Sequence, residues 1–274
     1  MTALEHFDAS AASYEANTAG CTVEVMEKCL SLLPEIDTDS VVLDNACGTG
    51  LSTHVLLRTL KDGSKPTIHV VDGAPKMVEI SRKRFEAYEN IHAKVAPGED
   101  LSAFSDGTFS HSVTNMGLFF FADASKGARE LFRTLAPGGT AVVTGWSDLG
   151  HLDSVHRVQK AIRPEDKPFQ LPIAKEWFDL GHMKQVLSEA GFGTRVETSE
   201  VTAHWAADNL QDLVQNMTTR LAAAVMKEWT DEEKKKAEEL FPEAMKPKYE
   251  EFTRSDGTKA VGLKMRAYIA LCKK

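Results

Sequence analysis

Two aspartates that end neighbouring apolar runs are the residues best placed for chemistry in this sequence. Asp44 precedes the glycine-containing segment 45–50, and Asp72 closes the next run of β-forming residues. Glycines at a turn from strand to helix let a ligand approach the backbone closely. A carboxylate at the end of the following strand is where Rossmann-like domains hold ribose hydroxyls. The pair therefore predicts a nucleoside-containing ligand at one edge of a sheet.

The glycine turn distinguishes between two kinds of nucleotide ligand. A dinucleotide fingerprint needs a third glycine to seat a pyrophosphate on the helix N-terminus, but the position three beyond Gly50 is Thr53. The carboxylate of Asp44 would repel a pyrophosphate, whereas it would attract a ligand that carries an ammonium and a sulfonium group. S-adenosylmethionine therefore fits this turn, and NAD does not.

The elements around these residues alternate between β-rich runs and helical patterns, which indicates a parallel sheet with right-handed crossovers. We expect strands at residues 41–45, 67–72, 91–95, 109–115 and 140–146. Asp123 is a good N-terminal cap for the fourth helix, and a Pro-Gly-Gly turn leads from that helix into the fifth strand.

The remaining sequence is expected to cover this sheet and to complete it. Residues 1–35 carry apolar side chains at helical spacing and are predicted to form a helical lid. Residues 147–180 read as an irregular loop or short helices, which would be an insertion. A helix is expected near 183–190 and a sixth strand at 196–203.

A second helical segment is expected to form a cover at residues 205–249. An apolar stripe over 210–225 and a capping box that starts at Thr230 indicate its helices. An Asp-Gly turn at 256–257 then leads into a strictly alternating last strand. The predicted fold class is α/β: a doubly wound, Rossmann-like, seven-stranded and mostly parallel sheet with an antiparallel last strand. Its core would comprise residues 36–204 and 250–274.

Composition and charge argue against several classes of partner. The chain has 274 residues and a formal net charge of -8, which opposes binding to the phosphates of a nucleic acid. Apolar runs are too short to span a bilayer and the N-terminus lacks a signal pattern, so a cytoplasmic protein is expected. The four cysteines have no CxxC spacing. We therefore expect no metal site.

An ordered series of motifs resembles the class I S-adenosylmethionine-dependent methyltransferases. The series runs from DNACGTG through VVDGAPKM and FSHSVTNMGLFFFAD to LFRTLAPGGT, over roughly residues 40–146. Within that superfamily, VLDNACGTG, NMGLFFFAD and the closing GLKMRAYIA are similar to small-molecule methyltransferases of fungal secondary metabolism, such as those that S-methylate gliotoxin-type dithiols.

The resemblance implies a set of cofactor-binding residues. Those around the methionine part would be Asp44, Ala46, Cys47, Gly48, Gly50, Asn115, Met116 and Gly117. Asp72 would take the ribose hydroxyls, with Gly73 and Met77 nearby. Gly98, Glu99 and Asp100 would meet the adenine, although this block departs from the family's usual order. Phe7-Asp8 and Tyr14-Glu15 resemble the family's N-terminal element, which folds over the cofactor.

The substrate pocket and any general base are less constrained. The aromatic and apolar residues expected in the pocket are Phe119, Phe120, Trp146, Trp177, Trp205 and Met217. A thiolate or neutral amine acceptor needs only positioning, whereas a hydroxyl needs a base. Weak candidates for that base are Tyr14, His151, His156 and His204. The sequence thus predicts methyl transfer to an S, O or N atom of a small molecule. A non-catalytic S-adenosylmethionine-binding regulator, or an enzyme acting on protein or nucleic acid, remains an alternative.

Overall fold

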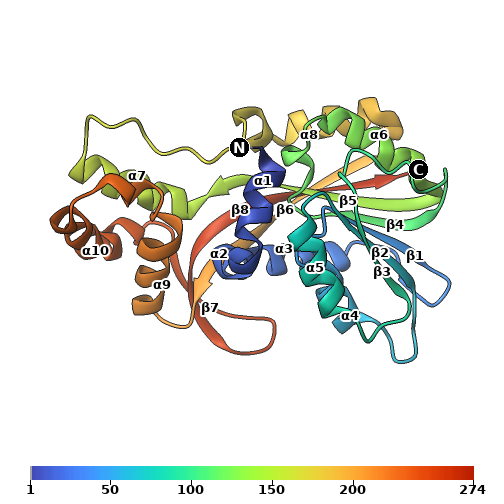
Figure 1. Cartoon of the computed structure of the whole chain (residues 1–274), viewed down its shortest axis with the longest axis horizontal. Coiled ribbons are helices and arrows are strands. Elements are labelled where there is room, and N and C mark those ends of the chain that lie inside the picture. The colour runs from blue at the N-terminus through green and yellow to red at the C-terminus, as the bar shows by residue number, and fades with distance from the viewer. Residues whose placement is uncertain (1) are drawn as a thin grey trace.

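An eight-stranded sheet forms the centre of the protein, in a computed structural model that describes residues 2–274 (Figure 1). Met1, with which the predicted lid begins, lies outside the described residues. The strand order is β3-β2-β1-β4-β5-β8-β6, and β7 pairs with β8. The strands are β1 (Val41–Asn45), β2 (Thr67–Asp72), β3 (Ile91–Val95), β4 (Phe109–Thr114), β5 (Leu135–Leu149), β6 (Val196–Ala207), β7 (Tyr249–Thr253) and β8 (Lys259–Lys273).

The parallel half of the sheet confirms the doubly wound prediction. Strands β1 to β5 pair in parallel, and β1 lies between β2 and β4. The chain therefore proceeds outward from β1 to β3 and then crosses back to the other side of β1. In such folds the crevice beyond the carboxyl ends of the strands, where the order reverses, is the usual ligand site. Here that point lies beyond β1 and β4.

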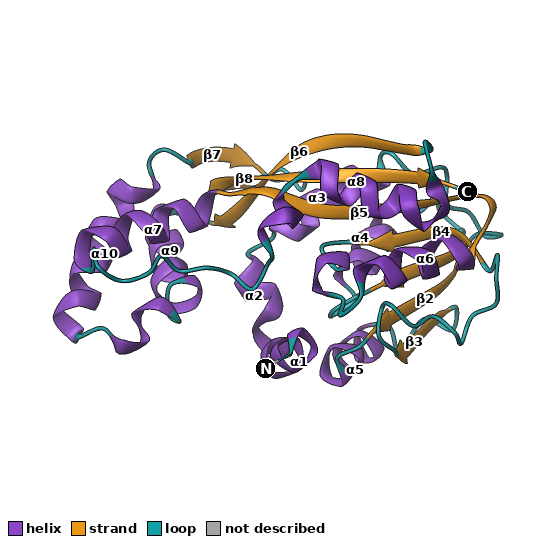
Figure 2. Cartoon of the chain, turned by 90° about the horizontal axis from the view of Figure 1, so that it is seen from above, coloured by secondary structure: helices purple, strands orange, loops and turns teal. Residues whose placement is uncertain are grey.

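The other half of the sheet is antiparallel and extends beyond the parallel core. Strand β8 runs antiparallel to both β5 and β6, as predicted for the last strand. Strand β7 was not predicted. It forms a hairpin with β8 through the Asp-Gly turn, where Gly257 has a φ of 86°. Figure 2 shows the long strands β5, β6 and β8 reaching toward a group of helices at one end of the molecule.

Helices cover the sheet and its extension. The α-helices are α1 (Ala3–Ser10), α2 (Tyr14–Thr18), α3 (Cys21–Leu30), α4 (Leu51–Thr59), α5 (Pro75–Arg84), α6 (Ala124–Thr134), α7 (Gly150–Ile162), α8 (Leu180–Leu187), α9 (Leu210–Asn216) and α10 (Asp231–Met245). Short 3-10 or π-helical turns are η1 (Ala11–Ser13), η2 (Leu118–Phe120), η3 (Lys175–Phe178), η4 (Ser188–Phe192), η5 (Met217–Leu221) and η6 (Val225–Glu228). The predicted caps are present: Asp123 caps α6, and Thr230 forms a capping box with Glu233 at α10.

Two segments differ from the prediction. Residues 147–180 do not begin as an irregular loop, because β5 continues to Leu149 by pairing with β8, and the 13-residue helix α7 follows. The apolar stripe over 210–225 is not one helix, because α9 passes into the π-helical η5 and then the 3-10 helix η6. Helix α7 packs against α10 and away from the parallel strands (Figure 2).

Candidate functional site

The loop after β1 adopts a conformation that exposes its backbone. Ala46, Gly48 and Gly50 have φ values of 56°, 55° and 83°. The left-handed region is readily available to glycine and costly for alanine, so Ala46 is a strained position. A Cβ at Gly50 would lie 2.5 Å from the Phe85 ring, which excludes larger residues there. This loop brings the end of β1 against the end of β2.

Asp72, at the end of β2, ties the two strand ends together. Its Oδ2 accepts a hydrogen bond from the Gly48 amide at 2.9 Å, and its Oδ1 accepts one from the Ala74 amide at 2.8 Å. Burial raises the pKa of this carboxyl, and the amide hydrogen bonds oppose that shift. Each carboxylate oxygen has lone-pair capacity for one more donor, so Asp72 can accept hydrogen bonds from a pair of hydroxyls.

Asp44 lies behind the loop. Its Oδ2 accepts hydrogen bonds from the Thr53 amide at 3.1 Å and the Thr53 hydroxyl at 2.6 Å. Thr53 lies in the first turn of α4, so Asp44 satisfies a free amide at that helix start. The other oxygen of Asp44 is buried and has no hydrogen-bond partner within residues 2–274. Burial raises the pKa of Asp44 to about 7.

The end of β4 supplies the opposite wall. The Asn115 side chain accepts a hydrogen bond from the Thr144 hydroxyl at 2.8 Å and donates one to the Thr22 carbonyl at 3.1 Å. Met116 has a φ of 57°, and its amide donates to the Thr144 hydroxyl at 2.9 Å. A Cβ at Gly117 would lie 2.6 Å from the Cβ of Ala46, so the β1 and β4 loops touch.

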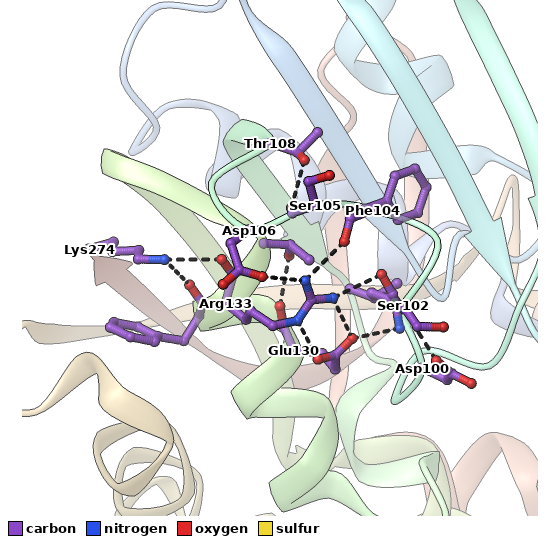
Figure 3. A network of polar contacts seen from close by, with 12 residues as sticks. Asp100, Ser102, Phe104, Ser105, Asp106, Thr108, Glu130, Arg133 and Lys274 are labelled. Atoms are coloured by element: carbon purple, nitrogen blue, oxygen red, sulfur yellow. Dashed lines mark hydrogen bonds and ion pairs between the residues drawn. The ribbon is translucent and has the colours of Figure 1, made fainter.

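The loop after β3 is held by a network centred on Arg133 of α6 (Figure 3). The guanidinium contacts Glu130 and Asp106, each at 2.7 Å, and donates to the carbonyls of Leu101 at 3.0 Å and Phe104 at 2.9 Å. These contacts hold residues 101–106, although Arg133 itself lines neither of the two cavities described below. Sequence reasoning did not identify this anchor.

The first residues of that loop face the end of β1. The Gly98 carbonyl accepts a hydrogen bond from the Asn45 side chain at 3.0 Å. A Cβ at Gly98 would collide with the Phe121 ring. Asp100 instead points to solvent, where it accepts a hydrogen bond from the Ser102 amide at 3.2 Å.

Helices α1 and α2 lie over the strand ends and are docked by two carboxylates. Asp8 accepts a hydrogen bond at 2.7 Å from the Lys76 amide in the first turn of α5. Glu15 pairs with Arg84 at 2.6 Å and also accepts a hydrogen bond from the Thr49 hydroxyl. The Phe7 ring packs edge-on against Phe120, with centroids 4.8 Å apart. The Phe-Asp and Tyr-Glu pairs of the N-terminus thus hold these helices against the glycine loop.

These walls enclose a cavity of about 390 Å³, which we call the strand-end cavity. The predicted cofactor residues that line it are Tyr14, Ala46, Gly48, Asp72, Gly73, Met77, Gly98, Glu99, Asn115, Met116 and Gly117. The structure does not bring Asp44, Cys47, Gly50 or Asp100 to its surface. Lining residues that sequence reasoning missed are Thr2, Ala3, Leu4, Phe121 and Ala122. Leu4 and Phe7 lie three apart on α1, and this helical spacing was the available signal.

A second cavity of about 190 Å³ adjoins the first, and we call it the aromatic cavity. The two cavities share Phe7, Tyr14, Met116 and Phe120 as lining residues. Of the residues predicted for a substrate pocket, Phe119, Phe120, Trp146 and Trp205 line the aromatic cavity. Trp177 and Met217 are buried elsewhere in the core. Cys21 and Thr22 of α3 and residues 171–173 also line the aromatic cavity; they lie within the predicted lid and the predicted insertion but were not predicted individually.

The predicted base candidates are separated by the fold. His151 lines the aromatic cavity. His156 is hydrogen-bonded to the Phe169 carbonyl at 2.6 Å, and His204 pairs with Glu24 at 2.8 Å while stacking on Phe252. Tyr14 borders both cavities, and burial raises the pKa of its phenol, so it remains protonated.

The strand-end cavity has the chemistry that S-adenosylmethionine requires. Its volume falls within the range of about 300–1,000 Å³ that small-molecule sites occupy. Asp72 can accept hydrogen bonds from the two ribose hydroxyls. Burial raises the pKa of Cys47 in the loop between Asp44 and Asp72, and the two carboxylates add a smaller effect in the same direction. Asp72 lines the cavity, and Asp44 lies behind its wall. An acidic environment suits a ligand that carries an ammonium and a sulfonium group.

Comparisons with known proteins find similarity to methyltransferases. Residues 42–139 match a family described as methyltransferase domain. The chain is 28% identical over 263 residues to methyltransferase ktnA of Aspergillus niger, covering 86% of this chain and 85% of the relative. It is 28% identical over 218 residues to acetylaranotin bis-thiomethyltransferase of Aspergillus terreus, and this match covers 75% of this chain and 72% of the relative.

The fold is also that of solved methyltransferases. Phosphoethanolamine N-methyltransferase 2 of Haemonchus contortus, solved with phosphomonomethylethanolamine and S-adenosylhomocysteine, superimposes with a TM-score of 0.55 at 14% identity. The match covers 97% of this chain and 57% of that chain. The matched domain and the sequence relatives identify an S-adenosylmethionine-dependent methyltransferase, and the sheet order and the strand-end cavity fit that activity.

No helix of residues 2–274 is long and apolar enough to cross a membrane. Over the same described range, no group of three or more His, Cys, Asp or Glu residues is arranged to hold a metal ion.

Proposed function

We propose that this protein transfers a methyl group from S-adenosylmethionine to an S, O or N atom of a compact, apolar small molecule, as a step in secondary metabolism. The observation that supports this proposal is the shared wall between the strand-end and aromatic cavities. A ligand in the strand-end cavity and a second ligand in the aromatic cavity would meet between Tyr14 and Met116. The relatives from Aspergillus support a role in secondary metabolism, since one of them is named for acetylaranotin.

The residues of this chain would act mainly by positioning. Bound S-adenosylmethionine supplies an activated methyl group, so the protein needs to align an acceptor with it and exclude water. Asp72 would hold the ribose, and Gly48, Gly98 and Gly117 would let the ligand lie against the backbone. Helices α1 and α2, docked through Asp8 and Glu15, would shield the reacting atoms from solvent.

Not all of the segments that the sequence predicted to cover the sheet line the two cavities. The aromatic cavity is lined by helices α1 to α3, by residues 171–173 and by Trp205. Among the described residues, 206–249 contribute to neither the strand-end nor the aromatic cavity. We therefore assign acceptor choice to residues 1–35, 147–180 and Trp205.

A polymer substrate is disfavoured by the shape and charge of the site. A groove for nucleic acid would be open and basic. Here the aromatic cavity holds about 190 Å³, and the chain carries a formal net charge of -8.

The test is to incubate the purified protein with S-adenosylmethionine labelled in its methyl group and a fungal metabolite extract. We expect label in a small organic product and stoichiometric S-adenosylhomocysteine. Trp205→Ala should bind S-adenosylhomocysteine like the wild type but lose transfer, whereas Asp72→Asn should weaken both. Cofactor binding with no labelled product would favour the non-catalytic regulator, and label in protein or nucleic acid would exclude a small-molecule acceptor.

A further inference from the structure

Two buried side chains that line the aromatic cavity, those of Thr22 and His151, hold a polar atom without a hydrogen-bond partner in the described chain. Of these two, His151 is the one that can take up a proton near neutral pH. It lies in the first turn of α7, directly after β5. The side chain is buried, and its Nδ1 has no hydrogen-bond partner in the described chain. The ring meets Trp205 edge-on, with centroids 5.9 Å apart. An unpartnered buried nitrogen is costly, so such a group in a cavity is a candidate for contact with a ligand.

The backbone fixes the position of this ring. A Cβ at the preceding residue, Gly150, would collide with the Lys264 carbonyl of β8, so α7 can start this close to the sheet only with glycine there. Strands β5 and β8 remain paired up to Leu149 and Met265, two residues that line the same cavity. His151 is therefore held on a rigid element rather than on a mobile loop.

The charge state of His151 follows from its surroundings. Burial lowers the pKa of this imidazole to about 4, and the opposing effect of Asp148 is smaller. Asp148 is itself engaged by Lys248 at 2.6 Å. The imidazole is consequently neutral near pH 7, and one of its nitrogens is free to accept a proton.

The other titratable side chains that face the aromatic cavity do not compete for this role. Burial raises the pKa of the Tyr14 phenol on α2 and raises that of the Cys21 thiol on α3 to about 12. Both groups stay protonated and act as donors. His6 on α1 lies at the exposed edge of the cavity.

We propose that His151 is the proton acceptor of the methyl transfer and that the acceptor is a hydroxyl group on a compact ring compound; this inference rests on the function proposed above. The hydroxyl oxygen forms a bond to the methyl carbon while the carbon–sulfur bond breaks, and that electron pair stays on sulfur. The O–H proton passes to a ring nitrogen of His151.

Charge conservation within the closed site favours this step. Before transfer the site contains one sulfonium charge and a neutral imidazole. Afterwards it contains a neutral thioether and an imidazolium, so no additional charge is buried. The loss of the nearby positive charge also raises the affinity of His151 for the proton. A thiol that ionises near neutral pH, or an amine with a free lone pair, would need no such acceptor.

The aromatic lining limits the shape of the hydroxyl compound. Phe119, Phe120, Trp146 and Trp205 present ring faces and edges to a small space, and flat rings pack well in such surroundings. A bicyclic phenol such as 1-naphthol is a suitable probe, and 1-naphthalenethiol is its counterpart of nearly the same shape.

The first experiment measures His151 itself by ¹⁵N NMR of labelled histidines, with His151→Asn used for assignment. In the S-adenosylhomocysteine complex, 1-naphthol should change the ring-nitrogen shifts of His151, and the ring should stay neutral down to about pH 5. Unchanged His151 shifts on naphthol saturation, or no naphthol binding at all, would overturn the proposal.

The second experiment compares transfer to the two probes. His151→Asn should lower methylation of 1-naphthol by about 100-fold or more at pH 7, the usual range for loss of a general base. This defect should shrink at higher pH as naphthol ionises, and methylation of 1-naphthalenethiol should change less than about fivefold. Equal loss with both probes, or no loss with naphthol, would contradict the role of His151.

Controls separate this inference from the function on which it rests. His92→Asn, at an exposed position on β3, should behave like the wild type with both probes. S-adenosylhomocysteine should bind to His151→Asn with unchanged affinity and produce the same thermal shift, which shows an intact fold. If S-adenosylhomocysteine failed to bind even to the wild type, the proposed function itself would be wrong.

Discussion

Replacement of Asp72 by asparagine tests the residue on which we expect cofactor binding to depend most. Each carboxylate oxygen of Asp72 already accepts one backbone amide, from Gly48 or from Ala74. Asparagine keeps one acceptor oxygen and turns the other into an NH₂ group, which cannot accept. One backbone amide then loses its partner, and one ribose hydroxyl loses a charged acceptor.

The expected effect on cofactor affinity follows from the loss of the charged acceptor for one ribose hydroxyl. A hydrogen bond to a charged group contributes about 1.5–3 kcal/mol. The dissociation constant for S-adenosylhomocysteine should therefore rise by about 10- to 150-fold, because about 1.4 kcal/mol corresponds to a factor of ten. The orphaned amide should lower the free energy of unfolding by about 1–3 kcal/mol.

Isothermal titration calorimetry and thermal unfolding measure these two quantities separately. Asp100→Asn is the matched control, since Asp100 is exposed and does not line the strand-end cavity. The control should bind with wild-type affinity. An unchanged dissociation constant for Asp72→Asn, or an equal loss in both variants, would refute the assignment of Asp72 to the ribose.

Three further predictions concern the surroundings of the ligand. Because burial raises the pKa of Asp44 to about 7 and a bound cation favours its ionised form, affinity for S-adenosylmethionine should rise with pH up to about 7 and level off above it; calorimetry should show a smaller dependence for Asp44→Asn. Phe7→Ala removes the ring that packs on Phe120, so dissociation of S-adenosylhomocysteine in stopped-flow experiments should be faster than from the wild type, and an unchanged rate would argue against the lid. Arg133→Met removes the anchor of the loop after β3 and should lower the melting temperature by several degrees, whereas a melting temperature within one degree of wild type would show that the network adds little.

The sequence predicted the arrangement of the site better than the direction of individual side chains. Glycine and aspartate at successive strand ends were sufficient to place Gly48 and Asp72 together, because parallel strands end at the same edge of the sheet. Asp44 lies in the same motif, but its carboxylate turns toward Thr53 of α4. Thr53, whose position distinguishes this turn from a dinucleotide fingerprint, is thus also the hydrogen-bond partner of Asp44. The spacing of residues in the sequence does not reveal that contact.

The regions that sequence patterns described less well depend on long-range pairing. Strand β7 carries two glutamates and pairs on one side only, so it lacks the apolar alternation of a buried strand. The change from α9 to the π-helical η5 leaves the apolar stripe intact while altering the backbone. The place of His151 in the aromatic cavity depends on the extension of β5 along β8, two strands more than 100 residues apart in the sequence.

A crystal structure with S-adenosylhomocysteine would test the central claim, that the two adjoining cavities form one reaction site. The ribose hydroxyls should lie against Asp72, and the sulfur should lie between Tyr14 and Met116, facing the aromatic cavity. A ligand with its sulfur directed away from that cavity, or one bound elsewhere on the chain, would contradict the assignment of the strand-end cavity to the methyl donor and of the aromatic cavity to the acceptor.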